Sequence, residues 1–286
     1  MRHAYLIMAH NEFGVLQKLV EALDDMRNDI FVHIDKKVAE CPLLRTVSAG
    51  LYYIRERIDV RWGSVSQIKA EYALFEEAYR RGQGYSRYHL ISGTHLPLRT
   101  QNFLHAYFAK QENFQWELLR YIYTNAYEVN MKLGRYHLFL NGYKHKVLWV
   151  RWLFSKMWHL ALKIQYFFGI QRAVPPVNIK ANNWVSLTDG AVGYIVRSKA
   201  EILKVFRWSF CGDEYFVPYL LQKGENRFKL RNDESFLYND IQENANARVL
   251  GREDYKKLKE SGSMFARKFS EQDMDVVNEI LRTLKN

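Results

Sequence analysis

The sequence predicts an α/β fold, in which strands and helices alternate along one chain. Its 286 residues are 48% apolar and include only five prolines, so the chain can bury one large core. An apolar run at 4–9 is followed by a helical pattern at 11–23 and a second apolar run at 29–34. This βαβ beginning favours a parallel sheet covered by helices.

The later elements follow the same periodicities. A short strand at 51–54 precedes a helix that ends at Arg81 before Gly82, and the spacing of Ser64 and Gln67 is that of a capping box. Strands are expected at 88–91, before Ser92 and Gly93, and at 183–187, before a helix near 191–206. A helix beginning with Asn11, one beginning near Asp213 and a C-terminal one at 276–284 complete the set.

The carboxyl ends of the strands are where open sheets bind ligands. In this chain that edge carries His10, Asp35, the segment Ser92–His95 and the turn at Thr188. The first turn, 9–14, fits neither the dinucleotide nor the P-loop spacing. A bound nucleotide would therefore need side chains to neutralise its phosphates.

Two basic residues near the C-terminus suit that purpose. Arg267 and Lys268 stand between Phe265 and Phe269, which suggests a segment held by its aromatic rings with its charges directed at an anion. The alternative is an ordinary solvated Arg-Lys pair.

A pair of carboxylates marks a candidate catalytic position. Asp213 and Glu214 follow a small-residue turn and precede an apolar run. Burial raises the pKa of a carboxyl group and a helix N-terminus lowers it, so an ionised oxygen there could face a cleft and accept a proton. The alternative, in which Asp213 caps the helix and Glu214 is solvated, stays open.

Basic charge concentrates in the middle of the chain. Nine Lys and Arg residues and no acidic residue lie between Glu128 and Asp189. Within 147–170 a helix would gather its polar residues on an arc of about 140°. Arg151, Lys156 and Lys163 would each cost about 2.5 to 3.5 kcal/mol near a bilayer centre, which disfavours spanning. The helix is expected either to lie on an anionic membrane surface or to dock on the core.

The two cysteines, Cys41 and Cys211, lack the number and spacing of a disulfide framework or a zinc site, which favours a reducing compartment. No export signal is expected at the N-terminus, because the apolar run begins at once and lacks a cleavage site. We therefore expect a cytoplasmic protein.

Six motifs occur in an order that resembles the core-2/I-branching β-1,6-N-acetylglucosaminyltransferase family, which also contains protein xylosyltransferases. They are His33–Lys37, Val60–Ser66 with Ala70–Glu71, Ser92–Leu98, Asn183–Thr188, Gly212–Glu214 and Phe265–Phe269. The match extends from about residue 4 to residue 269. The basic aromatic stretch is its least matching part.

The resemblance implies a GT-A fold, a Rossmann-like nucleotide-binding half merged with an acceptor-binding half. The chain would then be a single domain, 1–286, with a basic helical insertion at about 132–172. The resemblance also implies inverting transfer of a sugar, GlcNAc or xylose, from a UDP-sugar to a glycan hydroxyl. No bound metal and no further cofactor are implied.

Individual positions carry over from the family. Glu214 matches the general base, Lys268 the lysine that neutralises the departing diphosphate, and Asp35 the aspartate near the uridine. The remaining candidates are grouped by substrate: His10, Arg248 and Arg267 for the nucleotide-sugar, and Trp184, His95 and Asp213 for the acceptor. His95 stands where many relatives carry aspartate.

The absence of luminal cysteines and of a membrane anchor suggests a bacterial enzyme at the inner face of the membrane. It would act on a lipid-linked or surface-polysaccharide acceptor, and no nucleic-acid partner is expected. Two alternatives from other classes remain. One is a metal-dependent hydrolase that uses His10, His33 and Asp35. The other is a non-catalytic binder of polyanions or membranes that uses the charge at 132–180.

Overall fold

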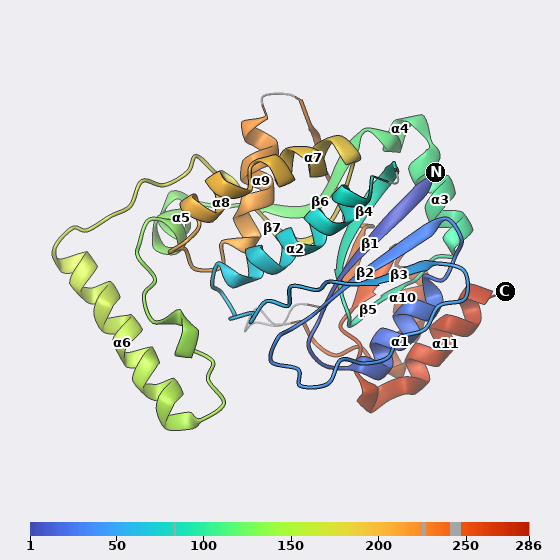
Figure 1. Ribbon diagram of the computed structural model, residues 1–286, viewed down its shortest axis with the longest axis horizontal. Helices are drawn as coiled ribbons and strands as arrows, with labels where there is room; N and C mark the ends of the chain where they lie inside the picture. The colour runs from blue at the N-terminus through green and yellow to red at the C-terminus, as the bar shows by residue number, and fades with distance from the viewer. Residues whose placement is uncertain (83, 225–226, 241–246, 286) are drawn as a thin grey trace.

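A twisted central sheet organises the molecule, as the computed structural model in Figure 1 shows for residues 1–82, 84–224, 227–240 and 247–285. Seven strands form it in the described part of the chain, in the order β3-β2-β1-β4-β7-β6-β8. They are β1 (Arg2–Ala9), β2 (Asn28–Ile34), β3 (Gly50–Tyr53), β4 (Tyr85–Ser92), β6 (Trp116–Tyr123), β7 (Ile179–Leu187) and β8 (Lys229–Asn232).

The sheet has two halves with different strand directions. The strands β3, β2, β1 and β4 are all parallel, so the predicted βαβ beginning is confirmed. Beyond β4 the pairing changes, because β7 runs antiparallel to both β4 and β6. The α/β class is thus confirmed, with a mixed second half that the sequence patterns did not predict.

Helices cover both faces of this sheet (Figure 1). One face is buried by α2 (Ser66–Arg81), α7 (Asp189–Arg197), α8 (Lys199–Val205) and α9 (Asp213–Lys223). The other is buried by α1 (Phe13–Ala22), α3 (Gln101–Ala109), α10 (Tyr255–Glu260) and α11 (Met274–Lys285). The shorter helices are α4 (Gln111–Phe114), α5 (Ala126–Leu133) and the 3-10 turns η1 (Leu140–Gly142), η2 (Arg252–Asp254) and η3 (Glu271–Asp273).

A small second sheet lies at the carboxyl edge of the first. Its order is β5-β10-β9, with β5 (His95–Pro97) antiparallel and β9 (Leu237–Asn239) parallel to β10 (Phe265–Arg267). The pairing brings three segments together that are far apart in the sequence. It places the Arg267 strand directly beside the strand that follows Ser92 and Gly93.

Several predicted boundaries need correction. The first helix begins at Phe13, not Asn11, and follows Glu12 in the left-handed region. The single helix predicted at 191–206 is two helices that meet at Ser198. The capping box does not form, because no side chain caps α2 and Gln67 binds elsewhere.

The predicted basic helix exists as α6 (Leu148–Phe167), which projects to the left in Figure 1. The alternative prediction, that this helix docks on the core, is wrong for most of its apolar residues. Seven of them are exposed: Leu148, Trp149, Trp152, Leu153, Leu160, Ile164 and Phe167. Among the described residues, no helix is both long and apolar enough to cross a bilayer.

Candidate active site

The turn before α9 is fixed by two other segments. The amide of Cys211 donates to the Gly63 carbonyl at 2.8 Å, and the amide of Phe210 donates to the Lys132 carbonyl at 2.8 Å. Gly63 has a φ of +72°, and a Cβ there would lie 2.7 Å from the Phe210 ring. Only glycine fits this close approach without strain, so Gly63 lets the turn before α9 pack at this position.

Asp213 points into the protein. Its Oδ2 accepts hydrogen bonds from Gln67 Nε2 at 2.7 Å and from Asn183 Nδ2, and its side chain does not cap the helix. Burial and the charge of Glu214 raise the pKa of Asp213 to about 6. Asp213 therefore ties α9 to α2 and β7.

A second buried carboxyl group completes this cluster. Asn183 Nδ2 lies 3.4 Å from an oxygen of Glu71, which is completely buried. Burial and the nearby Asp213 raise the pKa of Glu71 well above its ordinary value. The folded protein therefore favours the protonated form of Glu71, because a second anion beside Asp213 is destabilised.

Glu214 faces the other way, toward solvent. Its side chain is 33% exposed, and Oε2 accepts a hydrogen bond from Lys132 Nζ at 2.8 Å. Lys132 also pairs with Glu128 at 3.1 Å. Burial disfavours the charge on Lys132, but the attraction of Glu214 outweighs it and raises the pKa of Lys132. One oxygen of Glu214 is thus held, while Oε1 has no hydrogen-bond partner among the described residues.

The segment that carries Lys268 is clamped as predicted, since Phe265 and Phe269 are both fully buried. The Lys268 carbonyl accepts from the Leu250 amide at 2.8 Å, and the Phe269 amide donates to the Thr94 carbonyl at 3.0 Å. Within the described ranges the Lys268 ammonium forms no ion pair. It is a well-positioned cation whose charge is not neutralised there.

His10 and Asp35 lie at the same edge as Lys268. The Asp35 amide donates to the carbonyl of Ala9 at 2.9 Å, which sets the ends of β1 and β2 side by side. Desolvation lowers the pKa of the His10 imidazole; Asp35 opposes this effect, and Lys37 and Lys268 add to it. His10 is therefore neutral at pH 7 and within electrostatic reach of Lys268.

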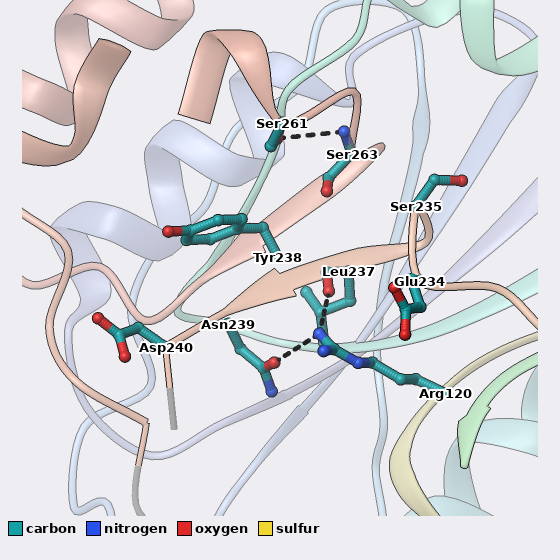
Figure 2. Close-up of a pocket in the computed structure, with 9 residues that line it drawn as sticks. All are labelled: Arg120, Glu234, Ser235, Leu237, Tyr238, Asn239, Asp240, Ser261 and Ser263. Atoms are coloured by element: carbon teal, nitrogen blue, oxygen red, sulfur yellow. Dashed lines mark hydrogen bonds between the residues drawn. The ribbon is translucent and has the colours of Figure 1, made fainter. Parts of the chain in front are cut away.

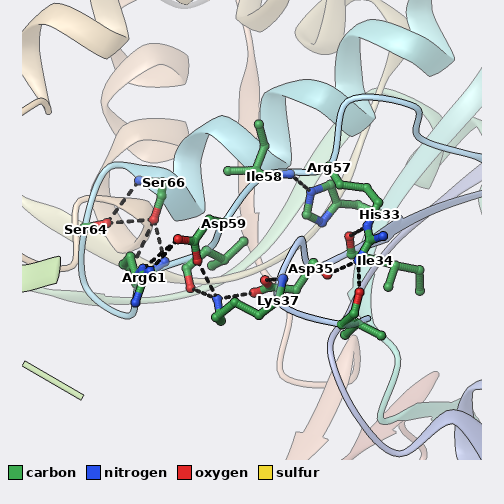
Figure 3. A network of polar contacts seen from close by, with 12 residues as sticks. His33, Ile34, Asp35, Lys37, Arg57, Ile58, Asp59, Arg61, Ser64 and Ser66 are labelled. Carbon is green, nitrogen blue, oxygen red and sulfur yellow. Dashed lines mark hydrogen bonds and ion pairs between the residues drawn. The ribbon is translucent and has the colours of Figure 1, made fainter. Parts of the chain in front are cut away.

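Figure 3 shows how Asp35 is held. Its Oδ1 accepts from the Lys37 amide at 2.9 Å and its Oδ2 from Lys37 Nζ at 2.7 Å. Arg57 donates to the carbonyls of Ile34 and Asp35 at 3.1 and 2.7 Å. These bonds hold the end of β2 rigidly before any ligand binds.

His33, in the same network, has a structural role. Its Nε2 accepts a hydrogen bond from the Ile58 amide at 2.9 Å, and burial lowers the pKa of His33 to about 4. That nitrogen is consequently occupied, which weighs against a metal bound by His10, His33 and Asp35. Across the described residues no three His, Cys, Asp or Glu side chains gather where they could hold an ion.

Arg267, Trp184 and His95 form one cluster. The Arg267 guanidinium lies 5.1 Å from the centre of the Trp184 ring, and the His95 ring meets Trp184 edge-on at 4.9 Å. Burial lowers the pKa of Arg267 to about 10, and its Nε has no hydrogen-bond partner among the described residues. His95 is fully buried, and its Nδ1 accepts a hydrogen bond from the Ser92 amide at 3.0 Å. This bond holds the His95 ring in place against the Trp184 ring.

Strand β7 separates the two groups of candidate residues. Asn183 binds Asp213, and its neighbour Trp184 contacts Arg267 and His95. The carboxylates at the start of α9 and the cations after β10 are therefore gathered around one short stretch of backbone.

Arg248 is brought near this edge but is already paired. Its guanidinium binds Asp254 at 2.6 Å and Asp240 at 2.9 Å, and these bonds raise the pKa of Arg248. Two residues on, Leu250 binds the Lys268 carbonyl. Arg248 thus lies close to the Lys268 segment with its charge neutralised.

A depression of about 650 Å³ borders the cluster and is shown in Figure 2. Arg120 of β6 crosses it and donates to the Leu237 carbonyl and to Asn239 Oδ1, both at 3.0 Å. Asn239 is opposite Arg267 in the small sheet. None of the site residues predicted from the sequence lines this depression.

Four residues of this arrangement were missed by the sequence patterns: Lys132, Gln67, Glu71 and Asn183. Two of them had a visible signal. Lys132 stands four residues after Glu128, a spacing that indicates an ion pair on a helix. Gln67 was placed in a capping box, although its amide group binds Asp213. Glu71 and Asn183 lay in quoted motifs but gave no sign of their partner.

We predict that Glu71→Gln makes the free energy of unfolding less dependent on pH. The unfolded chain ionises Glu71 above its ordinary pKa, while the folded protein retains the proton to higher pH, so the stability that wild type gains from this group is lost as pH rises. Relative to wild type, Glu71→Gln should gain at least about 1 kcal/mol in free energy of unfolding between pH 5 and pH 8. Urea denaturation at both pH values measures this.

The matched control is Glu56→Gln, since Glu56 is exposed. It should leave the pH dependence of unfolding unchanged. A Glu71→Gln protein whose stability follows that of wild type at both pH values would show that Glu71 is not protonated in the folded state.

Comparison with known proteins adds three findings. The family described as Core-2/I-Branching enzyme matches residues 3–244. Among solved structures, mouse xyloside xylosyltransferase 1 in its apo form is similar, with 10% identity, a TM-score of 0.40, and coverage of 93% of this chain and 96% of that one. No curated protein matches the sequence. The family match spans most of the chain, including both carboxylates at the start of α9, and the protein is therefore a glycosyltransferase that belongs to the Core-2/I-Branching enzyme family.

Proposed function

We propose that this glycosyltransferase is an inverting enzyme that moves a sugar from a UDP-sugar to a hydroxyl of a glycan acceptor. The observation that carries the proposal is the arrangement around β7. Asn183 binds Asp213, the residue before Glu214, and Trp184 contacts Arg267, the residue before Lys268. Such a transfer needs a base and a cation at the two ends of the reacting centre.

Glu214 acts as the general base. A hydroxyl is a poor nucleophile at neutral pH, and a positioned carboxylate that takes its proton contributes about a hundred- to ten-thousandfold. Lys132 holds Oε2 at 2.8 Å and so leaves Oε1 for the acceptor hydroxyl. Asp213 supports the base by fixing the first turn of α9, rather than by contacting the acceptor, because it is buried and bonded inward.

Lys268 neutralises the leaving diphosphate. Negative charge accumulates on this group as the glycosidic bond breaks, and a preorganised cation in a partly dry site stabilises it without reorganisation. Its neighbour Arg267 adds a second cation. The Arg267 guanidinium is already desolvated beside Trp184 in the folded protein, so its desolvation is not a further cost of binding the diphosphate. Arg248 would contribute only after giving up Asp240 or Asp254.

His10 and Asp35 bind the nucleoside part of the donor. Asp35 is held rigidly by Lys37 and offers carboxylate oxygens to a polar ring N–H. Neutral His10 adds a donor or acceptor next to Lys268 without an opposing charge. GlcNAc and xylose are the sugars that we propose for the donor.

The acceptor is proposed to be a lipid-linked or surface-polysaccharide glycan, and the enzyme to act in a bacterial cytoplasm at the inner face of the membrane. Trp184 contributes one wall of the acceptor side, with His95 behind it. The hydrolase and the non-catalytic binder considered from the sequence do not fit a glycosyltransferase family.

We predict separable effects at the two ends of the site. Glu214→Gln keeps the shape but cannot accept a proton, so transfer should fall at least about a hundredfold while UDP affinity stays nearly unchanged. Lys268→Ala should weaken UDP binding on the order of tenfold. Initial rates and calorimetric titration with UDP measure the two effects.

Lys256→Ala is the control for charge, because Lys256 is an exposed lysine outside the site. It should change neither quantity. Retention of more than a tenth of wild-type transfer by Glu214→Gln would contradict the assignment of the base.

We also predict that transfer needs no divalent metal. The segment Ser92–His95 at the end of β4 contains no carboxylate, whereas metal-dependent enzymes of this fold place two carboxylates near the diphosphate. The chain's Asp-x-Asp at Asp273 and Asp275 lies at the start of α11, where Asp273 accepts from the Arg252 amide. Transfer measured after exhaustive EDTA treatment should equal that of untreated enzyme. Loss of activity that manganese restores would refute this mechanism.

A further inference from the structure

The helix α6 rests on the protein along one narrow strip. Trp158 is buried there, where its Nε1 donates to His137 Nδ1 at 3.1 Å and its ring lies 5.4 Å from that of Phe210. Gln165 is the other buried residue, and it exchanges two hydrogen bonds with the backbone of Tyr136, at 2.7 and 2.9 Å. The strip therefore packs against the segment after α5 and, at Phe210, against the loop that leads into α9.

The opposite side of α6 is apolar and exposed. Five residues fall within an arc of about 60° when the helix is wound at about 100° per residue. We call them the outer stripe: Trp149, Leu153, Leu160, Ile164 and Phe167. Trp149 is 68% exposed and Phe167 82% exposed. A continuous apolar stripe of this kind on a projecting helix marks an interaction surface.

The basic residues beside the outer stripe indicate which kind of partner binds it. Lys156 and Lys163 lie within about 40° of its edge. Neither forms an ion pair within the described residues, and no acidic residue occurs between Glu128 and Asp189. A second copy of this chain would bring like charges together, whereas anionic headgroups around an apolar interior complement both features.

We propose that the outer stripe inserts into the interface of an anionic membrane, with Lys156 and Lys163 at the level of the lipid phosphates. The proposal extends the proposed function, because it names the surface at which the acceptor is met. The long lysine side chains can keep their ammonium groups at the phosphates while their stems lie along the apolar stripe.

The docked helix and the proposed base belong to one packed unit. Phe210 contacts Trp158 and lies four residues before Glu214. His137, which also contacts Phe210, bonds through its amide to the Trp208 carbonyl at 2.9 Å. A membrane-bound α6 would thus hold the start of α9 near the interface, where a lipid-linked acceptor is presented.

The test is sedimentation of the full chain with sucrose-loaded vesicles, without any nucleotide. Wild type should bind vesicles rich in phosphatidylglycerol and bind much less to vesicles of phosphatidylcholine alone. The triple variant Trp149→Ser, Leu160→Ser, Phe167→Ser should lower the partition coefficient on the order of tenfold or more. The double variant Lys156→Gln, Lys163→Gln should do the same at low salt.

Leu43→Ser with Val47→Ser is the matched control, because these exposed apolar residues are 78% and 96% exposed and lie outside α6. It should bind as wild type does. UDP-induced thermal stabilisation of every variant separates loss of membrane binding from loss of fold or of nucleotide binding.

Three results would overturn the proposal. Equal binding to both vesicle types would remove the requirement for anionic lipid. Sensitivity to the lysine substitutions without sensitivity to the stripe would indicate a water-soluble polyanion instead. A wild-type dimer that the triple variant converts to a monomer, with no vesicle binding by either, would assign the stripe to a second copy.

Discussion

Two neighbouring residues of β7, Asn183 and Trp184, connect the two halves of the site. One holds Asp213 and the other packs against Arg267 and His95. Val185 and Ser186 are paired with both β4 and β6, which anchors β7 directly after these two residues.

The ionisable groups at this edge differ in burial: some are buried and stabilise the fold, and others are partly exposed and available to react. Asp213 and Glu71 are buried among hydrogen-bond donors, and their raised pKa values reflect the cost of charge there. Glu214 remains partly exposed, with one oxygen held by Lys132. On the cationic side Arg248 is neutralised by two aspartates, whereas Lys268 is not neutralised among the described residues. Glu214, with one oxygen not held by Lys132, and Lys268, with no ion pair among the described residues, are therefore the side chains best placed to react with a substrate.

Local periodicity predicted the parallel half of the sheet because β1 and β2 contain apolar runs and α2 ends at a glycine. The small sheet escaped prediction, because its three-residue strands are too short to show a pattern and exist only through pairing between distant segments. The same reason explains Gln67, whose partner Asp213 is 146 residues away. The local spacing of Ser64 and Gln67 favoured a capping box, but in the structure the Gln67 amide group forms a long-range hydrogen bond with Asp213 instead.

The candidate site was predictable in its residue types and their order, and less so in its geometry. The motifs around Glu214 and Lys268 indicated the family, and the comparison established it over residues 3–244, a range that includes Glu214 but not Lys268. They gave no indication that Arg248 would be paired with acidic residues or that His95 would be buried. For α6 the composition indicated a basic amphipathic helix. Only the position of Trp158 reveals that the packed side is narrow and that the apolar stripe faces outward.

We propose that the edge formed by His10, Asp35 and Lys268 binds uridine diphosphate. Thermal unfolding in the presence of UDP, with ADP and GDP as comparisons, tests this proposal. A ligand at a hundred times its dissociation constant adds about 2.7 kcal/mol of stability. For a chain of this size we therefore predict a rise in Tm of roughly 5 °C with UDP and a much smaller rise with the purine nucleotides. An unchanged Tm with saturating UDP would contradict the account.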